Sequence, residues 1–146
     1  MIIIKTPVTK EDFKAYYALR YQILREPWGQ PKGSEKDDYE AISEHFMAVD
    51  EATGEVVGAV KLFEKASDVG HFSHLVIARA RQRQGIGRLL LAAVEARAKA
   101  LGFHSLGTMT SVTATNYFEK LGYQIGGLPG SMMGTSHLVW MEKSLA

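Results

Sequence analysis

The sequence predicts a mixed α/β domain, in which a mostly antiparallel central sheet carries helices on both faces. Three observations support this class. Short β-branched or apolar stretches recur along the chain, other stretches have helical periodicity, and glycine- or proline-containing turns separate them. The predicted order is β-α-β-β-β-α-β-α-β-β. A run of three strands followed by two β-α units favours a mixed sheet.

The first elements come from the N-terminal quarter of the chain. The isoleucine run at residues 2–4 predicts a strand. Thr9 is placed to cap a helix, with Asp12 in its first turn. One face of that helix carries Phe13, Tyr16, Tyr17, Arg20, Ile23 and Leu24. The following stretch, "EPWGQPKGSEKDDYE", is rich in proline and glycine and predicts a long loop that ends in an acidic turn.

Three strands are expected next. Residues 45–49 and 55–63 are apolar and flank "DEATGE", which predicts a hairpin with Gly54 in its turn. The stretch "EKASD" then predicts a second turn before a strand at residues 69–77. Consecutive strands of this kind most simply form a meander.

The second half alternates helices and strands. Residues 86–101 predict an amphipathic helix that ends at Gly102. Its expected apolar face consists of Ile86, Leu89, Leu90, Ala93, Val94 and Leu101. Further elements are predicted as a strand at 105–110, a helix at 113–121 closed by Gly122, and strands at 123–125 and 137–141.

Composition limits the class of protein. A chain of 146 residues with 46% hydrophobic and 23% charged residues suits one folded domain, predicted to span residues 1–146. No cysteine is present, so disulfides, thiolate zinc sites and cysteine nucleophiles are excluded. The N-terminal stretch lacks the features of a signal peptide, and no apolar run is long enough to span a bilayer. We therefore expect a cytoplasmic protein without membrane association.

The stretch "RARQRQGIGRLLL" at residues 79–91 concentrates positive charge around Gly85 and Gly87, where a strand gives way to a helix. The first N–H groups of a helix lack internal partners and lie at the positive end of its dipole. Glycine lets an anion approach these groups, and Gln82, Arg83 and Arg88 add donors at the rim. A diphosphate suits such a turn better than a single carboxylate.

Other interpretations of this turn can be compared. The P-loop pattern fails because no Lys-Ser or Lys-Thr follows either glycine, and the dinucleotide fingerprint fails because position 90 is leucine. The remaining pattern is Q-x-x-G-x-G. A solvated arginine face on an ordinary helix start stays an alternative. A nucleic-acid patch is disfavoured because the chain has net charge +1, no second basic run, and no aromatic residues among these arginines.

At this point two segments resemble the GNAT superfamily of acyl-CoA-dependent N-acyltransferases. Residues 75–103, "LVIARARQRQGIGRLLLAAVEARAKALGF", are similar to its pyrophosphate-binding strand, turn and helix. Residues 114–127, "ATNYFEKLGYQIGG", are similar to its "A-x-x-F-Y-E-K-L-G-F" segment. The predicted element order also agrees with that fold over nearly the whole chain. The resemblance implies an N-acetyltransferase that moves an acetyl or larger acyl group to a primary amine of a small molecule or protein in a ternary complex.

The resemblance also implies acetyl-CoA as the donor and assigns its contacts. The pyrophosphate would meet the backbone amides of Gln84, Gly85, Ile86, Gly87 and Arg88 and the side chains of Gln82 and Arg83. The splayed edge of the strand at Val76 and Ile77 would pair with pantetheine amides, and an N–H between Leu75 and Ile77 would polarise the thioester carbonyl. Ser111 and Phe118 occupy positions along the pantetheine and the thiol.

The proton of the attacking amine needs an acceptor, and His71 is the first candidate. Alternation along the strand puts His71 on the same face as Ser73, Leu75 and Ile77, and an acidic base often occupies this position in the family. A structural role for His71 is an equal alternative. His74 points to the other face, although a bulge would exchange the two roles. His137 is the second candidate, and no histidine spacing suggests a metal site.

One departure from the family pattern bears on catalysis. The family commonly has tyrosine where this chain has Phe118, and Tyr117 lies about 100° further round the helix. An acetyl-CoA-binding sensor with little turnover is therefore the alternative function.

Trp28 and Glu35 are the predicted acceptor contacts, with Asp37 and Asp38 able to attract a cationic amine. The expected state is a monomer or homodimer without nucleic acid.

Overall fold

The computed structural model describes residues 1–126 and 138–145. Two compact units make up the chain. The first unit comprises Met1–Phe63 and His74–Val94, and the second comprises Glu64–Ser73 and Glu95–Ala146. The third and fourth strands and the second helix each begin in one unit and end in the other. A single domain over residues 1–146 stays a prediction.

Seven strands form one mixed sheet in the order β1-β2-β3-β4-β5-β7-β6. Their bounds are β1 Ile2–Lys5, β2 Glu44–Asp50, β3 Val56–Ala66, β4 Val69–Ile77, β5 Ser105–Ser111, β6 Gln124–Ile125 and β7 Leu138–Ser144. Strands β1 and β2, β2 and β3, β5 and β7, and β6 and β7 pair antiparallel, whereas β4 and β5 pair parallel. The predicted fold class, a mostly antiparallel mixed sheet with helices, is confirmed.

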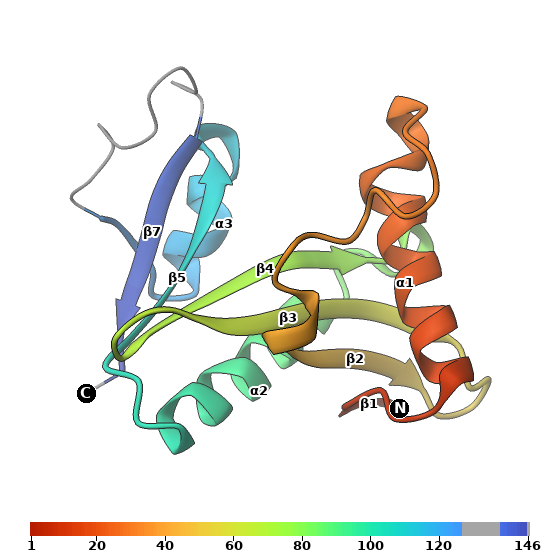
Figure 1. Ribbon diagram of the computed structural model, residues 1–146, viewed down its shortest axis with the longest axis horizontal. Helices are drawn as coiled ribbons and strands as arrows, with labels where there is room; N and C mark the ends of the chain where they lie inside the picture. The colour runs from red at the N-terminus through yellow and green to blue at the C-terminus, as the bar shows by residue number, and fades with distance from the viewer. Residues whose placement is uncertain (127–137, 146) are drawn as a thin grey trace. The chain divides into compact units, whose positions relative to one another are not determined.

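In the first unit, helix α1 (Lys10–Leu24) lies against the sheet (Figure 1). It begins in a capping box: Asp12 N donates to Thr9 Oγ1 at 3.0 Å, and Thr9 N donates to Asp12 Oδ2 at 3.1 Å. The predicted cap is therefore confirmed. The core beneath the helix consists of Tyr16, Leu19, Met47, Val49, Ala59 and Val76.

The opposite face of the same strands packs on helix α2 (Ile86–Ala100). A Cβ added to Gly58 would lie 2.9 Å from Leu90 Cδ1 and 3.1 Å from Ile86 Cγ2, so this glycine allows close contact between β3 and α2. Helices on both faces of this unit follow, as predicted. The predicted apolar face of α2 needs correction, because Leu89 and Leu101 are exposed. Ile86, Leu90 and Val94 are buried as predicted, and Leu91 and Ala98 are buried in addition.

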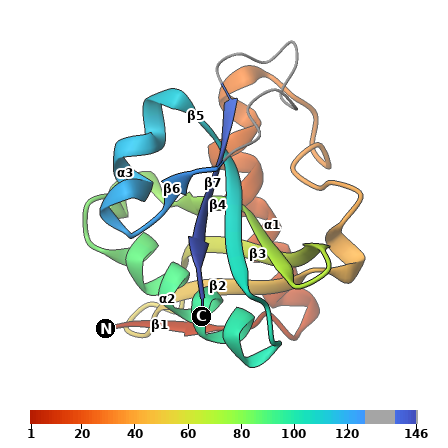
Figure 2. The same cartoon turned by 90° about the vertical axis from the view of Figure 1, so that its left-hand side faces the viewer.

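The second unit joins β5 to β7 and β7 to β6, with the short helix α3 (Thr115–Lys120) beside them (Figure 2). Phe72, Phe118 and Tyr123 pack together there, with ring centroids 5.7–6.2 Å apart. Trp140 of β7 crosses β5 at Gly107, where an added Cβ would lie 2.2 Å from the indole. This unit is therefore held mainly by aromatic packing.

Several predicted boundaries were wrong. The expected helix at 113–121 begins as a 3-10 turn, Val112–Ala114, because β-branched residues there disfavour a regular α-helix. Strand β3 runs on to Ala66, and Asp68 turns the chain at φ +63°. The expected loop at 26–40 contains the 3-10 turn Glu26–Trp28, and a second one, Glu40–Ile42, follows.

The last strand extends to Ser144, and His137 lies outside the described residues. In the part of the chain that the structure describes, no helix has the length and apolarity needed to cross a membrane.

Candidate active site

The predicted anion-binding turn lies in the first unit, between β4 and α2. After Ile77, Ala78 N donates to Val57 O at 2.9 Å, which ties the end of β4 to β3. The 3-10 turn Arg79–Arg81 follows. The chain then reverses through Arg83 at φ +66° and Gly85 at φ +81°. Left-handed residues next to a helix start turn successive N–H groups toward one concavity, which is a geometry that binds anions.

The start of α2 supplies N–H groups at this turn. Leu89 N donates to Gly85 O at 3.2 Å, so the N–H groups of Ile86, Gly87 and Arg88 precede the first bond of the helix. A Cβ added to Gly85 would meet no atom within 4 Å. The position of a side chain on Gly85 is therefore open, and the positive φ is what favours glycine there.

Not every arginine of the cluster is available to an anion. Arg81 Nη2 lies 2.6 Å from Asp50 Oδ2 and 3.5 Å from Glu55 Oε1, which anchors the turn to the β2–β3 hairpin. This contact, with the Ala52 amide, lowers the pKa of Asp50. Gln82 Nε2 points back to Ile77 O at 3.4 Å. Arg83, Gln84 and Arg88 are exposed at the rim, as the phosphate-binding interpretation expects.

A second polar group of the first unit is a network of buried charges around Arg20. Both Nη atoms of Arg20 donate to the Glu40 carboxylate at 2.8 Å, and Nη2 also donates to Glu35 O. The Arg20 side chain is fully buried. Tyr17 Oη donates to the same carboxylate at 2.9 Å. Despite burial, these partners hold the pKa of Glu40 well below its ordinary value, so Glu40 is ionised.

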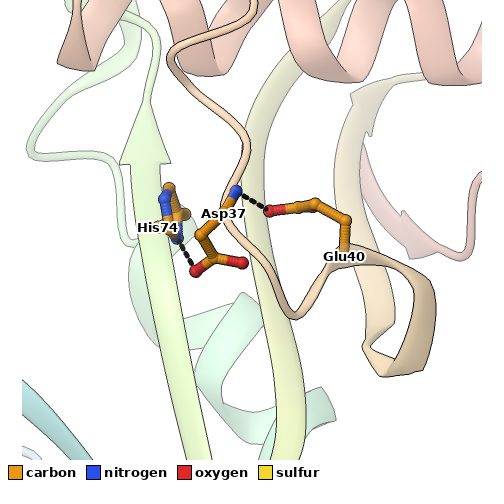
Figure 3. A group of neighbouring side chains, drawn as sticks. All are labelled: Asp37, Glu40 and His74. Atoms are coloured by element: carbon orange, nitrogen blue, oxygen red, sulfur yellow. Dashed lines mark hydrogen bonds and ion pairs between the residues drawn. The ribbon is translucent and has the colours of Figure 1, made fainter.

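Lys61 continues the network toward β4. Its Nζ is fully buried, 2.6 Å from Asp37 Oδ1 and 3.6 Å from Glu40 Oε2. Asp37 Oδ2 in turn lies 4.0 Å from Nδ1 of His74 (Figure 3). The backbone N–H of Asp37 donates to Glu40 Oε2 at 2.9 Å, which closes the network on itself. The segment around residue 37 is thus joined to β3 and faces β4 through charged side chains.

His74 departs from regular strand geometry. Its φ is +56°, a left-handed conformation in which histidine is more common than most residues. Its side chain is 13% exposed. Burial lowers its pKa to about 4, and the nearby cations Arg20 and Lys61 act in the same direction, against Asp37 and Glu40. His74 is therefore neutral at pH 7 and able to accept a proton.

Asp37, Glu40 and His74 also offer ligand atoms that lie within 4.8 Å of one another, which is close enough to hold a metal ion. Arg20 and Lys61 already neutralise the two carboxylates. The arrangement is accordingly better described as an internal charge network, and the expectation of no metal stays a prediction.

His45 is a structural member of the same region. Its Nε2 lies 3.0 Å from Glu40 O, a carbonyl that can only accept, so Nε2 carries the proton. Its Nδ1 then accepts from Tyr16 Oη at 2.8 Å. Burial lowers the pKa of His45, which keeps this arrangement neutral.

The second unit contains the remaining described candidates. The His71 ring packs edge-on against Trp140 at 5.1 Å, and Lys65 Nζ lies 3.7 Å from the centroid of that indole. The Ser111 hydroxyl is 2.8 Å from Thr113 Oγ1. Phe118 is buried among aromatic rings, whereas Tyr117 is 46% exposed.

The predicted acceptor contacts differ in their surroundings. Trp28 is 77% exposed, whereas Glu35 is buried and its carboxylate accepts from Gly33 N at 2.8 Å. The structure brings Trp28, Glu35, Leu75, Val76, Ile77 and the residues 82–88 into the first unit, and His71, Ser111, Tyr117 and Phe118 into the second.

The charge network is not predicted from the sequence. The helical period puts Arg20 on an aromatic helix face, and Lys61 lies in a stretch that predicts an apolar strand. Both positions carried a signal, because a charged residue on an otherwise buried face requires a partner of opposite charge. The partners could not be identified, since they come from a loop without periodicity.

Comparison with known proteins places the chain among acetyltransferases. Residues 13–123 match the profile of the acetyltransferase (GNAT) family. A Bacillus subtilis (strain 168) protein, named as a candidate acetyltransferase, is 19% identical over 143 residues, covering 96% of this chain and 95% of its own.

Solved structures of acetyltransferases have the same fold. A candidate N-acetyltransferase from Lactobacillus plantarum superposes with a TM-score of 0.84 at 25% identity, covering 99% of each chain. An aminoglycoside 6'-N-acetyltransferase complexed with coenzyme A has a TM-score of 0.81 at 19% identity, covering 99% of this chain and 97% of that one.

Proposed function

Because the chain belongs to the acetyltransferase (GNAT) family and is an acyltransferase, we propose that it transfers an acetyl group from acetyl-CoA to a primary amine. The acceptor is a small molecule or an exposed amine of a protein. One structural neighbour is an aminoglycoside 6'-N-acetyltransferase complexed with coenzyme A, which supports this donor and this class of acceptor.

The observation that carries the proposal is the turn before α2. Arg83 and Gly85 are left-handed, three helix N–H groups precede the first helical bond, and the position of a Gly85 Cβ is open. These features fit a diphosphate, which meets several amides in succession. The side chains of Gln82, Arg83 and Arg88 would surround it. The assignment of Ser111 and Phe118 to the pantetheine arm rests on the family resemblance.

The reaction places clear demands on the chain. The amine nitrogen attacks the thioester carbonyl carbon, the C–N bond forms, and the C–S bond breaks as the tetrahedral intermediate collapses. A backbone N–H of β4 between Leu75 and Ile77 would stabilise the oxyanion. The amine proton passes to a base, and the coenzyme A thiolate leaves and takes up a proton from solvent or a nearby hydroxyl.

Two histidines of β4 are the described candidates for the base. His71 is the candidate from strand alternation, and its ring lies against Trp140. His74 gains support from its left-handed backbone and its neutral imidazole beside Asp37, since an irregular strand exchanges the two faces. We therefore place His74 first and keep His71 as the alternative. Asparagine, which also tolerates the left-handed region, is the suitable replacement at His74.

The proton donor for the departing thiolate is less well defined than the base. Phe118 has no hydroxyl and packs against Phe72 and Tyr123, so it cannot donate a proton to the thiolate. Among the described candidates, the exposed Tyr117 and water are left as proton donors. This feature favours the second candidate function, an acetyl-CoA-binding sensor with little turnover. Calorimetric binding of acetyl-CoA without thiol release from any member of a panel of amines would support the sensor.

The donor site can be tested with Gly85→Val and a matched control at the other end of α2. Gly85 and Gly102 have nearly equal φ angles, +81° and +83°, and an added Cβ at either position meets no atom within 4 Å. Both variants should therefore lose similar stability. Only Gly85→Val should weaken acetyl-CoA binding, by about 10-fold or more, because its side chain occupies the phosphate approach. Equal affinities in calorimetry, with both variants folded, would refute the proposed donor site.

A further inference from the structure

We infer that Asp37 is a positioning residue for His74, and that buried Lys61 holds Asp37 in place for this purpose. The inference deepens the proposed function, because it assumes that His74 takes the proton of the acceptor amine. Binding of the acyl donor does not explain why the chain keeps a buried charge network. The inference gives this network a role, because it connects the segment around residue 37 to the proposed base.

The first argument is the selection of one tautomer. Asp37 Oδ2 faces Nδ1 of His74, and an ionised carboxylate only accepts hydrogen bonds. The proton of neutral His74 is therefore favoured on Nδ1. Nε2 then carries the lone pair that an attacking amine requires. A carboxylate and an imidazole arranged in this way form the base half of many transfer sites.

The second argument is how Asp37 itself is held. Its Oδ1 accepts from Lys61 Nζ at 2.6 Å and from Tyr39 N at 2.9 Å, whereas Oδ2 faces His74. Lys61 is fully buried, so its ammonium group depends on this carboxylate and on Glu40 for compensation. Rotation of Asp37 would therefore leave the buried ammonium with Glu40 alone, at the longer distance of 3.6 Å.

The third argument is access. The Asp37 side chain is 34% exposed, in contrast to the fully buried Lys61 and Arg20. The 4.0 Å separation from Nδ1 exceeds a hydrogen bond of about 2.9 Å, so a small shift of this segment is needed to close it. The loop that contains the predicted acceptor contacts therefore also carries the residue that orients the proposed base.

The charged groups that face His74 make opposite contributions. Arg20 from α1 and Lys61 from β3 oppose its protonation, whereas Asp37 and Glu40 favour it. Removal of Lys61 should therefore raise the pH at which His74 titrates, and removal of the Asp37 charge should lower it.

The direct test is an NMR titration of His74 in the full chain, with the resonance assigned from His74→Asn. Lys61→Met keeps the length of the side chain and removes its charge, so the midpoint should move upward by about one pH unit or more. Asp37→Asn should move it downward, and Glu51→Gln, at an exposed position in the turn between β2 and β3, should leave it in place. An unchanged midpoint in folded Lys61→Met and Asp37→Asn would overturn the coupling, whether or not the protein transfers acyl groups.

The kinetic test applies once an acceptor is found. Asp37→Asn should lower kcat by roughly 10-fold or more, with the KM for acetyl-CoA little changed, whereas Glu51→Gln should leave kcat unchanged. If Lys61→Met fails to fold, the comparison of Asp37→Asn with Glu51→Gln still decides the question. Equal kcat values for these two variants would overturn the positioning role. Loss of acetyl-CoA binding in Gly85→Val tests the donor site separately.

Discussion

The two compact units of the chain are stabilised in different ways. The first has charged groups in its interior, including the fully buried Arg20 and Lys61. Among the described residues, every buried polar side chain except Thr108 belongs to this unit. The second unit has an aromatic interior around Phe72, and its polar contacts, such as Lys143 with Glu95 at 3.1 Å, involve partly exposed side chains.

This difference indicates where function resides. Burying charge is costly even when the charges are paired, and apolar replacements are often as stable. The first unit retains such charges and also contains the proposed phosphate-binding turn and the proposed base, His74. We therefore expect substitutions in the first unit to act on stability and chemistry together. In the second unit, substitutions other than those of the proposed site residues His71, Ser111, Tyr117 and Phe118 should act mainly on stability.

The largest effect is expected from breaking the charge network. Glu40→Ala should reduce the free energy of unfolding by about 3–5 kcal/mol, because Arg20 would keep a buried charge without its main partner. Chemical denaturation measures this loss, with the exposed Glu51→Ala as a control of less than about 0.5 kcal/mol. Equal losses in the two variants would contradict the network. The double variant Arg20→Met with Glu40→Leu should recover most of the stability, because it removes both charges.

A comparable effect is expected in the second unit from packing alone. Gly107→Ala places a Cβ 2.2 Å from Trp140 Cζ2 and 2.6 Å from Met141 O, so both a ring and a neighbouring strand must move. The expected loss is about 3 kcal/mol. Gly58→Ala in the first unit meets side-chain atoms at 2.9 Å or more and should lose about 1–2 kcal/mol. Thermal unfolding that ranks these two variants in the opposite order would show that β5 and β7 adjust more easily than β3 and α2.

Acidification should destabilise the first unit, because it contains His74 and Glu40. His74 is neutral in the fold with a pKa of about 4, whereas an unfolded histidine has a pKa near 6.5, so the unfolded state binds more protons between these values. Stability should fall as the pH drops through this window, by at most ~3 kcal/mol. Glu40, whose folded pKa is lowered, adds a further loss below its ordinary value of 4.5.

His74→Asn should reduce the loss between pH 6.5 and 4, leaving the contribution of His45, whose pKa is also lowered, and the more acidic part. Denaturation curves at several pH values measure both. An unchanged slope in this window would mean that His74 is not held neutral by its surroundings.

The smallest effect on stability is expected from the loss of one side-chain hydrogen bond in the second unit. Tyr123 Oη donates to Glu95 Oε2 at 2.9 Å, and Tyr123→Phe should lose about 1 kcal/mol. The exposed Tyr39→Phe serves as the control and should lose less than about 0.5 kcal/mol. A loss above roughly 2 kcal/mol for Tyr123→Phe would indicate that hydrogen bonding is as important in this unit as in the first.

Local rules predicted much of the fold. The Thr9 cap, the Gly54 turn and the glycines at 102 and 122 were correct, because each depends on a few neighbouring residues. Helix faces were predicted less well. Leu89 follows the helical period yet is exposed, whereas Leu91 is buried, because the strands beneath α2 decide which stripe is covered. The family was also within reach of the sequence, since both of its motifs are continuous in the chain.

The sequence by itself determined the element order, the glycine turn and the family, because these depend on short stretches whose physical chemistry is local. Only the tertiary structure decided which charges meet. Arg20, Asp37, Glu40, Lys61 and His74 are separated by up to 54 positions, and neither periodicity nor spacing relates them. They pair because a buried charge requires a group of opposite charge beside it. Which group this is depends on the folded structure, which brings distant parts of the chain together.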